Sequence, residues 1–265
     1  MYIANATGCS SIWGNSSPST PYTVNAKGQG PAWDNSLFED NAEFGYGMLL
    51  AQNAIRTRLK KEVEELAEKD ASVKDVAQEW LDTFGVGATN GAATEKLVAA
   101  LADKTDDLSK DLVKNKDFLA KKSQWIFGGD GWAYDIGFGG LDHVLASGKD
   151  INVMVFDTEV YSNTGGQSSK STPTGAVAQF AAGGKETGKK DLPGIAMSYG
   201  YVYVAHINMG GDMQQTVKAI AEAEAYPGPS LIIAYAPCIN HGIKKGMAKA
   251  MTEEKLALQT GYWNN

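Results

Sequence analysis

The chain has 265 residues, of which 43% are hydrophobic, enough for one large or two small globular domains with a sizeable core. Its formal net charge of -7 argues against electrostatic binding to nucleic acid or to an anionic membrane. No apolar run approaches the roughly 18–20 residues of a membrane-spanning helix, and the first residues lack the pattern of a secretory signal. Two cysteines cannot build a disulfide framework, so we expect a reducing, cytoplasmic compartment.

Charged residues are concentrated in the middle of the chain. Residues 51–122 contain 27 of the 55 charged side chains, three of the 30 glycines and none of the eight prolines. Apolar residues spaced by four, four and three predict one buried helix face: Ile55, Leu59, Val63 and Leu66. Glu65 can pair with Lys69 on another face, and glycine-rich residues 85–91 predict a break before further helix around residues 97–119. We expect a helical insert whose charges face solvent and carry no chemistry.

Outside this segment, strand and helix patterns alternate. A capping box at residues 36–39 predicts the start of a helix. Downstream, the patterns predict a strand at 124–127, a helix to about 147, a strand at 151–156, a polar loop at 157–174, a helix at 192–199, a strand at 201–207, a helix from Asp212 and a strand at 230–235. The alternation predicts an α/β fold with a doubly wound, mostly parallel sheet, which binds ligands outside the carboxyl ends of its strands.

One candidate site begins with Gly129-Asp130-Gly131, directly after a predicted strand. A carboxylate between glycines can hold a divalent cation while bare backbone approaches a phosphate, and Mg2+ commonly shares its oxygen ligands between protein and a diphosphate. The next strand ends in a polar loop, where the Thr158 hydroxyl and the Val160 carbonyl could complete a clamp. With 30 glycines in the chain, a turn without a ligand is at least as good an explanation of the triplet alone.

The triplet and the loop resemble the thiamine diphosphate motif, in which Gly-Asp-Gly is followed about 30 residues later by an asparagine. Here Thr158 occupies the usual asparagine or aspartate position, and Asn163 follows five residues later. Further segments narrow the resemblance: residues 7–14, 28–33, 37–40, 161–167 and 236–242. Together they resemble the C-terminal thiamine-binding domain of the large single-chain pyruvate:ferredoxin (flavodoxin) oxidoreductases. The resemblance covers essentially residues 1–265, which we expect to form one thiamine diphosphate-binding domain that includes the insert at about 51–122.

The resemblance implies roles for individual residues. Mg2+ would be bound by Asp130, Thr158 and the carbonyl of Val160, and Asn163 would be catalytic, hydrogen-bonding the substrate oxygen that gains charge. Cys9 and Cys238 would supply two of the four thiolates of a [4Fe–4S] cluster beside the cofactor. The residues expected to line thiamine diphosphate are Cys9, Gly129, Asp130, Gly131, Trp132, Thr158, Glu159, Val160, Tyr161, Ser162 and Asn163.

The three histidines and Lys170 are considered separately from the proposed ligands. We expect His143 and His206 to be structural and Lys170 to be solvated. His241 lies in the second cysteine loop, where it could bond a backbone group or a cluster sulfur.

The implied activity is oxidative decarboxylation of pyruvate to CO2 and acetyl-CoA, with coenzyme A as acyl acceptor and electrons passed through [4Fe–4S] clusters to ferredoxin or flavodoxin. The other cluster ligands and the pyrimidine-binding domain of the family are not in this sequence. We therefore expect a fragment, inactive alone, whose partners are the missing domains of the same polypeptide in a homodimer. The alternatives are a catalytically silent module, a related 2-oxoacid:ferredoxin oxidoreductase with another substrate, or a non-redox 2-oxoacid decarboxylase, which the cysteine loops disfavour.

Overall fold

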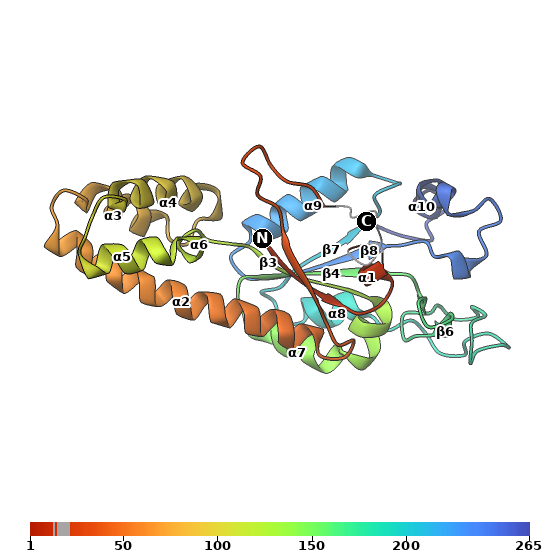
Figure 1. Ribbon diagram of the computed structural model, residues 1–265. Helices are drawn as coiled ribbons and strands as arrows, with labels where there is room; N and C mark the ends of the chain where they lie inside the picture. Colours follow the sequence, from red (N-terminus) through yellow and green to blue (C-terminus); the bar gives the residue numbers. More distant parts are fainter. Residues whose placement is uncertain (13, 15–21) are drawn as a thin grey trace. The chain divides into compact units, whose positions relative to one another are not determined.

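The computed structural model describes residues 1–12, 14 and 22–265 (Figure 1). Trp13, in the first cysteine-containing segment, lies outside the described residues. The chain divides into two compact units. Residues Met1–Tyr46 and Gln124–Asn265 form the first, and Gly47–Ser123 form the second.

The first unit is built on a six-stranded sheet in which every strand is parallel to its neighbours, in the order β2-β1-β3-β4-β8-β7. Its strands are β1 (Tyr2–Ala6), β2 (Ala32–Ser36), β3 (Gln124–Gly129), β4 (Ile151–Asp157), β7 (Tyr203–Ile207) and β8 (Pro229–Tyr235). Helix α9 (Met213–Ala225) covers one face, while α7 (Phe138–Ala146) and α8 (Leu192–Met197) cover the other (Figure 1). Covering both faces explains the apolar run of β4, and the predicted doubly wound α/β fold is confirmed.

Shorter elements complete the first unit. A two-stranded antiparallel ribbon, β5 (Val160–Tyr161) and β6 (Gln167–Ser168), lies within the predicted polar loop. The remaining helices are α1 (Cys9–Ser11), the π-helix η2 (Gly131–Ile136), the 3-10 turns η3 (Ile239–His241) and η4 (Met247–Lys249), and α10 (Ala250–Gln259). Asp130 lies between the last residue of β3 and the first residue of η2, so it is placed at the carboxyl end of the sheet.

The predicted capping box at residues 36–39 is wrong, because the helix α2 (Asn41–Lys69) begins later. Ser36 instead ends strand β2, paired with Ala6, and its hydroxyl donates to Asn41 Oδ1 at 3.0 Å. The parallel pairing of β2 with β1 therefore holds Ser36 in a strand, although its local sequence favours the start of a helix.

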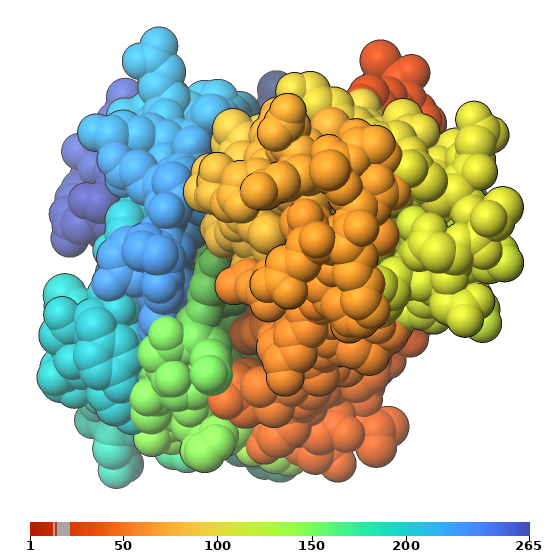
Figure 2. Space-filling view, turned by 90° about the vertical axis from the view of Figure 1, so that its left-hand side faces the viewer, coloured from red at the N-terminus to blue at the C-terminus, as the bar shows by residue number. Residues whose placement is uncertain are grey.

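The second unit is helical and has its own core. It contains the rest of α2 together with α3 (Lys74–Thr83), α4 (Gly87–Leu101), α5 (Asp107–Lys114) and α6 (Lys116–Leu119). Figure 2 shows the atoms of α2 to α4 in orange and yellow. The predicted apolar face is confirmed, since Leu59, Val63 and Leu66 are buried in this core. The predicted Glu65–Lys69 pair is also present, at 2.5 Å.

Asn90 and Gly91 do not break a helix, contrary to the prediction, but lie inside α4. The side chain of Asn90 is buried, and its Oδ1 accepts from Lys121 N at 2.7 Å and from Arg56 Nη2 at 3.0 Å. These tertiary hydrogen bonds outweigh the local preference of an Asn-Gly pair for a turn. The break itself lies between Thr83 and Gly87, as the glycine pattern predicts.

Arg56 holds three segments of the second unit together. It is 7% exposed, and its guanidinium donates to the carbonyls of Phe84 (2.9 Å) and Leu119 (3.3 Å) as well as to Asn90. Burial lowers the pKa of Arg56 to about 10. Within the described residues, the guanidinium is thus surrounded by neutral oxygens and by the Phe84 ring, 4.2 Å from the guanidinium carbon.

Arg56→Met is expected to lower the free energy of unfolding by about 2–3 kcal/mol, because it leaves buried carbonyl oxygens without a donor. Urea denaturation of the chain would measure the change. Arg58→Met is the matched control, since Arg58 is exposed and its ion pairs with Glu62 and Asp111 should contribute less than about 1 kcal/mol. Equal losses in the two variants would contradict the structural role of Arg56.

Candidate functional site

The predicted site assembles at the carboxyl ends of two neighbouring strands. Gly129 of β3 pairs with Phe156 of β4, so the residues that follow these strands meet at one edge of the sheet. Asp130 is 1% exposed, and its Oδ1 accepts from Thr158 N at 3.1 Å and from Thr158 Oγ1 at 2.8 Å. The structure therefore brings together the carboxylate and the hydroxyl that the sequence pattern paired.

The third expected metal ligand lies at the same point. Thr158 Oγ1 is 3.0 Å from the carbonyl oxygen of Val160, as well as 2.8 Å from Asp130 Oδ1. Adjacent oxygen ligands of an octahedral Mg2+, each 2.0–2.1 Å from the ion, lie about 3 Å apart. The spacing and the all-oxygen chemistry of these donors fit Mg2+. Among the described residues, no three histidine, cysteine, aspartate or glutamate side chains gather into a metal site.

Electrostatics at this point favour a cation. Burial, and then the charge of Asp157, raise the pKa of Asp130 to about 7. Asp157 is fully buried, but its carboxylate is occupied by protein groups: the N–H of Glu159, the hydroxyls of Ser171 and Tyr134, and the ammonium of Lys189. Asp130 accepts only from neutral donors, Thr158 and Ser169, among the interactions of the described residues, whereas Asp157 also pairs with the Lys189 ammonium.

A hydroxyl-rich segment that the sequence analysis treated only as polar loop orients these carboxylates. Ser169 Oγ donates to Asp130 Oδ2 at 2.6 Å, Ser171 Oγ donates to Asp157, and Thr172 Oγ1 donates to the carbonyl of Glu159. All three hydroxyl residues are buried. Four hydroxyl residues among the five at 168–172 were the available signal in the sequence, but the burial of Ser169, Ser171 and Thr172 depends on tertiary contacts.

The other residues expected to line the cofactor differ in exposure. Ser162 Oγ donates to Thr158 Oγ1 at 2.6 Å, while Asn163 is exposed on the same loop. Tyr161 packs closely on Gly131, where an added Cβ would lie 2.6 Å from the ring. Trp132 is fully buried.

The two cysteines are far apart in sequence, yet the charges of Cys238 and Asp130 both act on Cys9. Burial, and then the charges of Cys238 and Asp130, raise the pKa of Cys9, whose thiol also interacts with Ser162. Cys238 Sγ accepts from Asn240 N at 3.4 Å. Neither cysteine forms a disulfide.

His241, whose role the sequence left open, bonds backbone groups. Its Nε2 lies 2.6 Å from the carbonyl oxygen of Thr158, and its Nδ1 lies 3.2 Å from Cys238 N. A carbonyl only accepts and an N–H only donates, so these contacts require the neutral tautomer with hydrogen on Nε2. The ring thus links the second cysteine loop to the residue that follows β4. Lys170 is exposed, and its ammonium pairs with the Asp135 carboxylate at 3.1 Å.

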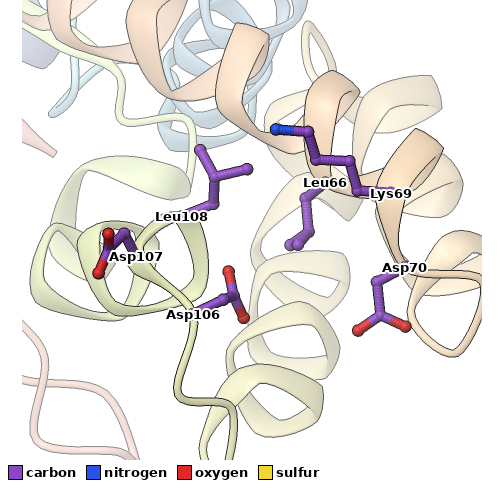
Figure 3. Close-up of a pocket in the computed structure, with 6 residues that line it drawn as sticks. All are labelled: Leu66, Lys69, Asp70, Asp106, Asp107 and Leu108. Carbon is purple, nitrogen blue, oxygen red and sulfur yellow. The ribbon is translucent and has the colours of Figure 1, made fainter.

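A separate cavity of about 420 Å³ lies in the second unit (Figure 3). Its lining residues are Leu66, Lys69, Asp70, Asp106, Asp107 and Leu108. Two of its acids already have structural partners: Asp70 pairs with Lys104 at 2.6 Å, and Asp106 accepts from Ser109 N at 2.9 Å. Asp70 and Asp106 therefore already serve the structure of the helical unit.

Comparison with known proteins decides the family. The family described as "Thiamine pyrophosphate enzyme, C-terminal TPP binding domain" matches residues 83–234, more than half of the chain. The chain belongs to this family. The match to the TPP-binding domain includes Gly129, Asp130, Thr158 and Val160. No described helix of this domain is both long and apolar enough to cross a membrane.

Several relatives are similar over essentially the whole chain. The chain is 58% identical to the pyruvate-flavodoxin oxidoreductase of Klebsiella pneumoniae, with 100% of this chain and 23% of the relative covered. It is 58% identical to the pyruvate:ferredoxin oxidoreductase of Moorella thermoacetica, covering 99% of this chain and 23% of the relative. The chain thus spans less than a quarter of the length of these relatives. A solved structure, the 2-oxoglutarate:ferredoxin oxidoreductase of Magnetococcus marinus, matches 90% of this chain and 55% of its own, with 15% identity and a TM-score of 0.48.

Proposed function

We propose that this domain binds Mg2+ and thiamine diphosphate as part of a pyruvate:ferredoxin or pyruvate:flavodoxin oxidoreductase. The observation that carries the proposal is the convergence of three oxygens at the ends of β3 and β4, where Thr158 Oγ1 lies within 3.0 Å of both Asp130 Oδ1 and the Val160 carbonyl oxygen. The relatives named above, at 58% identity, support pyruvate as substrate and ferredoxin or flavodoxin as electron acceptor.

When bound, thiamine diphosphate supplies a nucleophilic carbon and an electron sink for decarboxylation of a 2-oxoacid. The chain's own residues hold and orient it. Asp130 offers a negative charge to the metal, Gly129 lets the backbone approach the diphosphate, and the Asn163 amide donates to the substrate oxygen that gains charge. The overall reaction converts pyruvate and coenzyme A to acetyl-CoA, CO2, one proton and two electrons.

The electrons leave through iron–sulfur clusters in this proposal. Cys9 and Cys238 would ligate one [4Fe–4S] cluster together with two thiolates from elsewhere in the polypeptide, since the chain contains only two cysteines. The N–H of Asn240 would hydrogen-bond the ligating sulfur of Cys238. A homodimer of the complete polypeptide and cytoplasmic localisation belong to the same proposal.

The full polypeptide that contains this sequence provides the test. We expect it to reduce ferredoxin or a low-potential dye only when pyruvate, coenzyme A and thiamine diphosphate are all present. Faster reduction with another 2-oxoacid would assign a related oxidoreductase. CO2 release without dye reduction would assign a non-redox decarboxylase, and failure to bind Mg2+ and thiamine diphosphate would refute the proposal altogether.

Asn163→Ala is expected to lower kcat by about 100-fold or more, because a donor to developing negative charge is lost. The dissociation constant for thiamine diphosphate should change little, since the exposed amide is not among the oxygens proposed to hold the metal. Steady-state kinetics and a fluorescence titration of the cofactor separate these effects. Asn53→Ala, at an exposed position of the second unit, is the control. An unchanged kcat in Asn163→Ala would remove Asn163 from the reaction.

A further inference from the structure

Glu159 has a backbone conformation that residues with a Cβ rarely adopt. Its φ is 61°, in the left-handed region, and it is one of two such non-glycine residues in the described chain. It stands between Thr158 and Val160, which contribute two of the three oxygens at the proposed metal position. The left-handed turn at residue 159 lets a side-chain oxygen of one neighbour and the carbonyl oxygen of the other come within 3.0 Å.

Four hydrogen bonds or ion pairs hold this unfavourable turn. The N–H of Glu159 donates to Asp157 Oδ1 at 3.1 Å, and its carbonyl accepts from Thr172 Oγ1. Its carboxylate accepts from Tyr262 OH at 2.7 Å and lies 3.3 Å from Lys189 Nζ. Glu159 is 8% exposed, so these contacts are largely shielded from water.

We propose that Glu159 is a positioning residue whose anchored side chain keeps the Thr158–Val160 turn in the shape that binds Mg2+. The inference rests on the proposed function, since it concerns the same metal position. Glu159 does not itself coordinate the ion: its carboxylate is engaged by Lys189 and Tyr262. Tyr262, 103 residues further along the chain, thus contributes to metal affinity without contacting the metal.

A simple charge effect would give a different pattern. If Glu159 acted by attracting a cation electrostatically, any neutral replacement would weaken binding equally. If it acts through the shape of the turn, the loss should depend on whether the replacement tolerates a positive φ. Glycine adopts this conformation without strain, whereas alanine does not. Alanine and glycine variants therefore distinguish the two roles.

The experiment compares Glu159→Ala, Glu159→Gly and Tyr262→Phe in the full polypeptide. MgCl2 is titrated at fixed thiamine diphosphate while tryptophan fluorescence is recorded, and kcat is measured at low and saturating Mg2+. We expect Glu159→Ala to raise the dissociation constant for Mg2+ at least ten-fold and Glu159→Gly to stay within three-fold of the unmodified protein. Tyr262→Phe should raise it two- to five-fold, and saturating Mg2+ should restore kcat in all three variants.

Equal losses in the alanine and glycine variants, or no loss in the alanine variant, would overturn the positioning role. If Glu159→Ala does not fold, the conservative Tyr262→Phe decides alone, and an unchanged Mg2+ affinity there would overturn the role. These outcomes require that the unmodified polypeptide binds Mg2+ and thiamine diphosphate. Its failure to do so would refute the proposed function instead, so the two failures are distinguishable.

Discussion

Asp130→Asn is expected to weaken Mg2+-dependent binding of thiamine diphosphate by about 100-fold or more, while making the cofactor-free protein more stable above pH 7. The first effect follows because Asp130 is the carboxylate proposed to bind the metal, and a neutral amide attracts a divalent cation far less. The amide oxygen of the variant can still accept from Thr158, so the turn after β4 keeps its hydrogen bonds.

The gain in stability follows from the raised pKa of Asp130. Its folded-state pKa of about 7 exceeds the ordinary value near 3.9, so folding disfavours the ionised form. Between these values the native state binds more protons than the unfolded state, and stability falls as pH rises through this window. Removing the carboxylate abolishes that loss, so the difference between variant and unmodified protein should grow from pH 4 to pH 7 and then level off.

Two measurements check these opposite effects. Fluorescence titration with thiamine diphosphate, with and without MgCl2, gives the affinity, and thermal denaturation at pH 5 and pH 8 without cofactor gives the stability. Asp82→Asn is the control, because Asp82 is an exposed aspartate of the second unit. Cofactor affinity unchanged in Asp130→Asn would exclude Asp130 as a metal ligand.

The residues of the site that were predictable from sequence are those that directly follow the ends of two strands. The apolar run of β4 and the Gly-Asp-Gly triplet after β3 both indicate where a buried parallel strand ends. Parallel neighbours place these ends at one edge, which is why Asp130 and Thr158 could be paired before their 2.8 Å contact was seen. The adjacency of two parallel strands is the one long-range feature needed to bring these residues together.

The groups that hold the site in shape were not predictable in this way. Ser169 lies 39 residues from Asp130, and Tyr262 lies 103 residues from Glu159, so no local spacing relates them. The positive φ of Glu159 is equally hidden, because glutamate carries no preference for that conformation. Local signals also failed at Ser36 and Asn90, where strand pairing and a buried side-chain hydrogen bond override them.

Gly128→Ala is expected to destabilise the fold by about 3 kcal/mol, whereas Gly129→Ala should change stability by less than about 1 kcal/mol. A Cβ on Gly128 would lie 2.4 Å from Trp132 Cε3 and 3.1 Å from Ala6 Cβ, inside a packed core that cannot yield without shifting a buried indole. A Cβ on Gly129 would meet no atom closer than the Phe156 carbonyl oxygen, at 3.9 Å. Urea denaturation of the cofactor-free protein should therefore show a much larger loss of unfolding free energy for Gly128→Ala than for Gly129→Ala.

For cofactor affinity we expect the opposite order: the substitution at Gly129 should have the larger effect and the substitution at Gly128 the smaller. Protein packing gives no reason for glycine at position 129, so its bare backbone points to a requirement of the bound state, in which a diphosphate approaches closely. Gly129→Ala should weaken thiamine diphosphate binding at least ten-fold with little effect on unfolding. The residual folded fraction of Gly128→Ala should bind with nearly normal affinity. If Gly129→Ala bound as tightly as the unmodified protein, the diphosphate would have to lie elsewhere along this edge of the sheet.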